Sequence, residues 1–318
     1  MDTSAPVVSE RSTFAAAVAE SLARRPRQLP TRYLYDALGS ALFDAICRLP
    51  WYRVTRAESG LLEQHADAIL APLARPVSVV ELGCGNGEKL AALIERAREP
   101  VHRAHLVDIS PAALQSAHAR LSTVPDVLVT TFEGTYEDGL ARLSAEPHVG
   151  GCLALFLGSN IGNFDPETAQ GLLRRLRGSL GAGDALLIGT DLVKPERELQ
   201  LAYDDPLGVT AAFNRNLLRR VNAELDGDFD LHGFVHRAVW KASERRVEMH
   251  LVSTRRQQVR IAAADLDVTF EPDEWIWTES SYKYEPDVVL GEGRAAGFTG
   301  ADQWIDQHAR FALTRFTV

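Results

Sequence analysis

Between residues 77 and 191 the chain alternates short apolar runs with segments whose apolar residues are spaced three and four apart. Short apolar runs are typical of buried strands, and the wider spacing is typical of amphipathic helices. The pattern predicts strands at 77–82, 104–109, 127–132, 152–158 and 184–189, and helices at 88–98, 111–121 and 166–180. Because strands that alternate with helices pair in parallel, this region predicts an α/β, doubly wound sheet.

Outside this region the pattern differs. Helices are expected at 13–25, 41–48 and 57–70, and residues 1–12 are expected to be disordered. After a long amphipathic helix at 209–225, four runs of β-type residues follow at 234–241, 247–254, 259–270 and 275–282. Consecutive strands without helices predict an antiparallel meander, and hence a second subdomain inserted after the fifth parallel strand. A helix at 288–296 and strands at 303–306 and 311–316 would complete the first sheet.

Composition narrows the function classes. The net charge of −9 over 318 residues argues against nucleic-acid binding, since such proteins are usually basic. No apolar run approaches a membrane span, and the first residues lack a signal-peptide pattern, so a cytoplasmic protein without membrane contact is expected. The three cysteines and nine histidines show no ligand spacing, so no metal site is expected.

The most informative segment reads VVELGCGNGEK, a buried strand followed by a glycine turn and a helix start. Gly83, Gly85 and Gly87 allow positive φ and a close approach to a ligand. The dinucleotide fingerprint needs a further glycine where this chain has Glu88. An acidic residue opening the loop suits S-adenosylmethionine (SAM), a cationic amino acid joined to a nucleoside. Asp108 ends the next apolar run, where a carboxylate reaches the ribose hydroxyls. A tight turn without a ligand is the alternative.

Polar residues near other strand ends provide a second candidate surface. Gly158 and Asn163 follow the fourth parallel strand, and an amide that donates and accepts suits a zwitterionic ligand. Glu279 and Ser281 share one face of a strand, where they can bind an imidazole N–H, an amine or an amide. Each of these residues also has a purely structural alternative. Gly158 and Asn163 could belong to a Gly/Asn-rich turn, Glu279 and Ser281 to a solvated strand face, and Tyr203 to the core.

These segments, in this order, resemble the histidine Nα-methyltransferase family of ergothioneine biosynthesis. The resemblance runs from Phe14 to the C-terminus and is strongest in LPTRYLYDALGSALFDAICRLPWYRVTRAE, LFLGSNIGNF, LLIGTDLVK, YDDPLGVTAAFNRNLLRRVNAEL and TESSYKY. It implies a class I (Rossmann-like) SAM methyltransferase domain, formed by 58–191 plus 285–318. It also implies an inserted α+β substrate-binding domain, formed by 13–57 plus 192–284.

The resemblance further implies individual roles. For L-histidine these are Asn163 and Tyr203 at the carboxylate, Gly158 and Tyr35 at the amine, Glu279 and Ser281 at the ring, Tyr52 as a further contact and Met249 as pocket wall. Tyr35 and Asn163 are the catalytic candidates. For SAM the residues are Gly83, Gly85, Gly87, Lys89, Asp108, Thr135 and Tyr136. The family commonly has Gly-Asp-Phe, with the Asp facing the adenine amino group, where this chain has Gly-Thr-Tyr. Thr135 cannot supply that carboxylate, and Glu133 or Glu137 is the candidate substitute for it.

The implied function is SAM-dependent conversion of L-histidine, by successive methyl transfers, to trimethylhistidine (hercynine) by a monomeric enzyme. An N-methyltransferase of another amino acid or of a thiolated histidine stays open, as does a SAM-binding protein without catalysis. An NAD-dependent reductase is disfavoured by Glu88 in the glycine loop.

Overall fold

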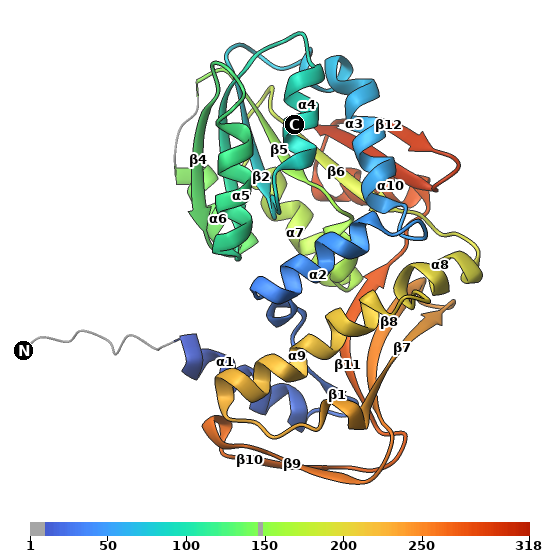
Figure 1. Ribbon diagram of the computed structural model, residues 1–318. Coiled ribbons are helices and arrows are strands. Elements are labelled where there is room, and N and C mark those ends of the chain that lie inside the picture. The colour runs from blue at the N-terminus through green and yellow to red at the C-terminus, as the bar shows by residue number, and fades with distance from the viewer. Residues whose placement is uncertain (1–9, 146–148) are drawn as a thin grey trace, which may run out of the picture. The chain divides into compact units, whose positions relative to one another are not determined.

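The computed structural model describes residues 10–145 and 149–318, and the chain divides into two compact units (Figure 1). The sheet unit contains Tyr52–Pro195, Ala242–Arg246 and Ser281–Val318. The small unit contains the described residues up to Trp51 together with Glu196–Lys241 and Val247–Ser280. The main divisions thus fall after residues 51, 195 and 280, beside the predicted divisions after 57, 191 and 284.

The sheet unit is built on seven strands in the order β12-β13-β6-β5-β2-β3-β4. They are β2 (Val77–Leu82), β3 (Val101–Asp108), β4 (Leu128–Glu133), β5 (Gly151–Phe156), β6 (Ala185–Asp191), β12 (Gly300–Asp306) and β13 (Phe311–Thr317). Strands β2 to β6 pair in parallel, and β13 is antiparallel to β6 and β12. Every residue of β2, β5 and β6 is buried, which explains their continuous apolar runs. The predicted doubly wound α/β sheet is confirmed.

Helices cover both faces of this sheet. One face packs on α6 (Tyr136–Ala145), α7 (Pro166–Gly178) and α10 (Pro286–Ala296) through a continuous apolar core. The strands also contact α3 (Val54–Leu70) and α5 (Pro111–Leu121), and α4 (Glu88–Arg96) packs between these two helices.

Local sequence signals fix several helix starts. α5 and α7 each begin with a proline after a residue whose side chain accepts a backbone N–H of the first turn, Ser110 and Asp165. α6 was not predicted. Its start is capped by Thr135 and Asp138, which exchange hydrogen bonds of 2.8–3.3 Å, and this Thr-x-x-Asp spacing is the signal that could have revealed it.

The small unit contains a four-stranded sheet in the order β1-β11-β8-β7. Its strands are β1 (Arg27–Gln28), β7 (Phe234–Lys241), β8 (Arg246–Ser253) and β11 (Trp275–Tyr282). Its helices are α1 (Glu10–Ala23), α2 (Ala37–Arg48), α8 (Glu196–Tyr203) and α9 (Val209–Leu225), with short 3₁₀ turns η1 (Thr31–Leu34) and η3 (Leu231–Gly233).

The predicted meander is wrong in its third strand. Residues 259–270 do not form one strand but lie in a hairpin of β9 (Gln257–Ile261) and β10 (Leu266–Phe270), a separate two-stranded sheet. The chain reverses through η4 (Ala262–Ala264) and Asp265, which adopts φ 45°. Without glycine or proline this turn gives no strong sequence signal.

The N-terminal prediction needs one correction. Residues 1–9 of the expected disordered segment lie outside the described residues, but residues 10–12 are helical and form the first turn of α1. Within the described ranges, no helix is both long and apolar enough to span a bilayer. The same ranges contain no group of three or more His, Cys, Asp or Glu side chains arranged to hold a metal ion.

Candidate active site

The glycine loop after β2 has a backbone that requires glycine. Gly83, Gly85 and Gly87 have φ of 76°, 53° and 73°. Gly87 precedes the first residue of α4, and a Cβ there would lie 2.9 Å from the Cα of Ala117 in α5. A Cβ on Gly85 would meet nothing within 4 Å. The loop is therefore held tightly at its helix end and is open at its centre, where a ligand could approach the backbone.

Asp108, at the end of β3, holds this loop. Its Oδ2 accepts a 3.0 Å hydrogen bond from the N–H of Gly85, and its Oδ1 accepts one of 2.9 Å from Ser110. Burial raises the pKa of Asp108, and these N–H donors limit the rise. A carboxylate has further lone pairs, so Asp108 can also accept from ligand hydroxyls.

An ion pair whose carboxylate is fully buried links the glycine loop to the turn that follows β5. Lys89 Nζ in α4 lies 2.6 Å from Oε2 of Glu58 in α3, whose side chain is 0% exposed. Both oxygens of Glu58 also accept the N–H of Gly158, at 2.9 and 2.8 Å. Glu58 was not predicted from the sequence as a site residue. A charged residue on the buried face that carries Val54 and Leu61 was the available signal.

Glu81 adds a second buried carboxylate at the end of β2. Burial raises its pKa to about 8; Lys89 opposes this rise, while Glu58 and Asp108 add to it. Among the described residues, Glu81 Oε2 has no hydrogen-bond partner.

The charges and the space around the glycine loop suit SAM. Glu81 lies within the electrostatic reach of Glu58 and Asp108 as well as of Lys89, and its raised pKa keeps it largely protonated at neutral pH. A bound cation would favour its ionised form, and SAM carries a sulfonium and an ammonium group. The open space at Gly85 and the unpartnered oxygen of Glu81 both accommodate a cationic ligand. The residues therefore fit the cofactor.

Two of the residues predicted to bind SAM, Thr135 and Tyr136, lie at the start of α6. Thr135 donates its N–H and its hydroxyl to Asp138, at 3.0 and 2.8 Å. Tyr136 packs edge-on against Phe156, and a Cβ on Gly83 would lie 3.1 Å from its ring. Tyr136 is thus beside the glycine loop, whereas Thr135 serves as the helix cap, and the adenine contact remains a prediction.

The turn after β5 lies against the same loop. Gly158 has φ 76°, and η2 (Asn160–Asn163) follows it. A Cβ on Gly158 would lie 3.2 Å from Lys89 Nζ, and a Cβ on Gly83 would lie 3.1 Å from Asn160 Nδ2. The structure therefore brings Gly158, Lys89 and the loop together, with Asn163 at the end of η2.

Ser281 is tied to the same turn through charged side chains. Lys283 Nζ donates to Ser281 Oγ at 2.8 Å and lies 2.9 Å from Oδ2 of Asp191. The N–H of Asp191 donates to Ser159 Oγ at 2.9 Å. No local sequence pattern indicates these contacts, because the residues that make them are spread over more than a hundred positions.

The remaining predicted substrate residues belong mostly to the small unit. In the small unit, the ring of Tyr35 packs edge-on against Phe213, the Tyr203 carbonyl accepts from His236 at 2.8 Å, and Met249 is buried. The carbonyl of Glu279 accepts from the indole of Trp277 at 2.9 Å. Tyr52, in the sheet unit, is buried. Their substrate roles stay predictions.

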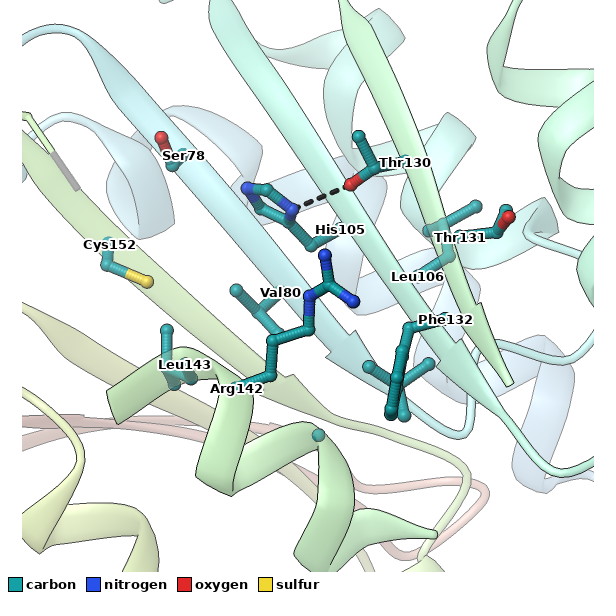
Figure 2. Close-up of a pocket in the computed structure, with 12 residues that line it drawn as sticks. Ser78, Val80, His105, Leu106, Thr130, Thr131, Phe132, Arg142, Leu143 and Cys152 are labelled. Carbon is teal, nitrogen blue, oxygen red and sulfur yellow. Dashed lines mark hydrogen bonds between the residues drawn. The ribbon is translucent and has the colours of Figure 1, made fainter. Parts of the chain in front are cut away.

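A cavity of about 40 Å³ lies between α6 and the middle of strands β2 to β4. Figure 2 shows the residues that line it. His105 Nδ1 lies 2.7 Å from Thr130 Oγ1 at its wall. The cavity contains none of the predicted site residues, and ligand pockets usually exceed about 300 Å³. It is therefore a packing void under α6 and not the cofactor site.

Known proteins are similar to this chain over nearly its whole length, including the segments that carry the predicted site residues. A family model described as histidine-specific methyltransferase, SAM-dependent, matches residues 14–318. The histidine N-alpha-methyltransferase of Mycolicibacterium smegmatis is 42% identical over 300 residues, covering 93% of this chain and 92% of that protein. The enzyme of the same name from Mycobacterium tuberculosis is 41% identical with the same coverage. Ergothioneine biosynthesis protein 1 of Schizosaccharomyces pombe is 31% identical over 268 residues, covering 80% of this chain and 34% of that protein.

Proposed function

The chain belongs to the family of SAM-dependent, histidine-specific methyltransferases, and from this premise we propose that it methylates the α-nitrogen of L-histidine in ergothioneine biosynthesis. The strongest support is that the match runs through both the glycine loop and the strand carrying Ser281. We propose that successive transfers lead to the trimethylated product.

SAM, when bound, supplies a methyl group on a positively charged sulfur. We propose that the backbone of the glycine loop and Lys89 hold its amino-acid part and that Asp108 holds its ribose hydroxyls. A cationic ligand is favoured over a neutral one because it stabilises the ionised form of the buried Glu81, whose pKa Glu58 and Asp108 help to raise.

The substrate contacts are assigned as proposals. They are Asn163 and Tyr203 for the carboxylate, Glu279 and Ser281 for the ring, Tyr35 and Gly158 for the amine, and Tyr52 and Met249 as further pocket residues. Binding the amino acid at its carboxylate and its ring fixes the nitrogen between them, and such orientation supplies much of the rate of a displacement. The nitrogen must be neutral to attack, so Tyr35 hydrogen-bonds to the amine while water carries its proton away.

The substrate is a small molecule, and we propose that the enzyme acts as a cytoplasmic monomer. Every predicted cofactor residue comes from one unit of one chain, which supports a cofactor site completed without a second copy.

The test is mass spectrometry of the purified protein with SAM and each of the twenty amino acids, plus thiolated histidine. Trimethylation of histidine alone is the expected result. Methylation of a different amine would overturn the substrate assignment while leaving the cofactor in place. SAM binding without any product would instead favour a non-catalytic protein.

A further inference from the structure

The end of β4 lies beside the residue proposed to hold the ribose of SAM. β3 and β4 pair in parallel with Asp108 opposite Glu133, and the N–H of Gly134 donates to the carbonyl of Asp108 at 3.0 Å. The glycine loop follows β2, which lies on the other side of β3. Since the amino-acid part and the base of SAM leave opposite sides of the ribose, the base extends toward the end of β4 and the start of α6.

Two exposed carboxylates near this strand end, those of Glu133 and Glu137, are directed elsewhere. Phe132 lines the cavity between the strands and α6 (Figure 2). Successive side chains of a strand alternate in direction, so Glu133 leaves β4 on the face opposite to α6. Oε1 of Glu137 lies 3.4 Å from a guanidinium nitrogen of Arg175 in α7. Neither carboxylate is therefore held at the start of α6.

The carboxylate of Asp138 is held there by Thr135. The N–H and the hydroxyl of Thr135 both donate to Oδ2 of Asp138, at 3.0 and 2.8 Å, and the N–H of Asp138 donates to Thr135 Oγ1 at 3.3 Å. The bonds from the N–H and then the hydroxyl of Thr135 hold the pKa of Asp138 below its usual range, so this carboxylate is ionised at neutral pH. Both protons of Thr135 are used in this pair. A carboxylate has about four lone-pair sites, so the exposed Asp138 can accept further bonds.

We infer that Asp138 accepts a hydrogen bond from the amino group of the SAM base; the inference rests on the proposed function, which places the ribose at Asp108. The amino group of adenine donates, whereas a purine with a keto oxygen at that position accepts. An ionised carboxylate only accepts, so Asp138 favours adenine over the keto base. Asp138 is thereby a specificity-determining residue for the base, and Thr135 positions its carboxylate.

The test compares two analogues of the cofactor that differ only in the base. S-adenosylhomocysteine carries adenine, and S-inosylhomocysteine carries a keto oxygen in place of the amino group. Titration calorimetry of the unaltered protein should give a Kd about 10- to 100-fold lower for the adenine analogue, as expected for a hydrogen bond to a charged group. Asp138→Asn should reduce this preference to about threefold or less, because the amide N–H groups can donate to the keto oxygen. The amide oxygen can still accept from Thr135, so the cap of α6 is kept.

Asp165→Asn is the matched control. Asp165 caps α7 as Asp138 caps α6, and its side chain accepts the N–H and the hydroxyl of Thr168 at 2.9 and 2.8 Å. This variant should keep the preference for the adenine analogue. An unchanged preference in Asp138→Asn would mean that Asp138 only caps α6, and would overturn the inference. Absence of any preference in the unaltered protein, or its loss in Glu133→Gln or Glu137→Gln in place of Asp138→Asn, would also overturn it.

A second variant covers the case in which Asp138→Asn does not fold. Asp138→Gln removes the charge, and glutamine at this helix position also accepts the N–H of the capping threonine. Both analogues bind without turnover, so the comparison does not depend on which amine the enzyme methylates. Absence of histidine methylation by the unaltered enzyme would refute the proposed function, while the binding preference of the Asp138 variants still decides the inference.

Discussion

The carboxylates around the glycine loop differ in what each of them binds. Asp108 accepts two backbone N–H groups, and Glu58 accepts one and pairs with Lys89. Glu81 has an oxygen without a partner among the described residues. Burial raises the pKa of both Asp108 and Glu81; the backbone N–H donors of Asp108 limit its rise, and Lys89 opposes the rise of Glu81.

At the residue scale, Asp108→Ala is expected to weaken SAM binding about 100-fold, because it removes both the ribose acceptor and the bond that holds Gly85. Isothermal titration of SAM measures this. Histidine KM at saturating SAM serves as the control and should change little. An unchanged SAM affinity would show that Asp108 only shapes the loop.

Glu81 should make SAM binding depend on pH. Its pKa rises from 4.5 to about 8 in the folded protein, so the folded state holds a proton that the unfolded chain loses. The resulting stability is fully present below pH 4.5 and is lost as the pH rises through 8. A bound cation favours the ionised carboxylate, so SAM binding at pH 7 should release a proton. Calorimetry in buffers of different ionisation enthalpy measures that proton. The Glu81→Gln variant should release fewer protons on SAM binding than the unaltered protein. Equal proton release by the two proteins would contradict the role assigned to Glu81.

At the scale of secondary-structure elements, two ion pairs join α3 to α4 and differ in burial. In the Glu58–Lys89 pair the carboxylate is fully buried. In the Glu63–Arg96 pair both side chains are exposed, and Glu63 Oε2 lies 3.5 Å from a guanidinium nitrogen of Arg96. Both pairs link the same two helices, so the exposed pair is a matched control for the buried one.

Glu58→Gln should lower the free energy of unfolding by about 3 kcal/mol, because it leaves the Lys89 ammonium without its buried partner. Glu63→Gln should change it by less than about 1 kcal/mol, as for other exposed pairs. Urea denaturation followed by circular dichroism gives both values. Similar losses of unfolding free energy in the two variants would mean that the burial of Glu58 contributes nothing to the stability of the fold.

At the scale of the whole molecule, the predicted cofactor residues all belong to the sheet unit, whereas Tyr35, Tyr203, Met249 and Glu279 belong to the small unit. Changes in the small unit should therefore affect histidine and leave SAM binding intact.

Glu279→Ala tests this separation. Loss of a carboxylate acceptor for the ring N–H should raise the KM for histidine about 100-fold, with the Kd for SAM unchanged. Steady-state kinetics and SAM titration on the same preparation give both numbers. A parallel loss of SAM affinity would contradict the separation of roles between the units.

The sequence by itself determined the features that depend on near neighbours. The apolar runs predicted the parallel strands, and the bounds of β2, α5, α9 and β11 match the structure residue for residue. The pattern E-x-G-x-G-x-G predicted the positive φ of the glycine loop. These succeed because strand, helix and turn preferences arise from residues a few positions apart.

Only the tertiary structure decided which distant charges meet. Glu58 lies 100 positions from Gly158, and nothing in either segment indicates the other. The same holds for the Asp191–Lys283–Ser281 cluster and for the folding of residues 257–270 into a separate hairpin. Such contacts depend on the path of the whole chain, and a buried charge finds its partner through strand order and helix packing that local periodicity does not encode.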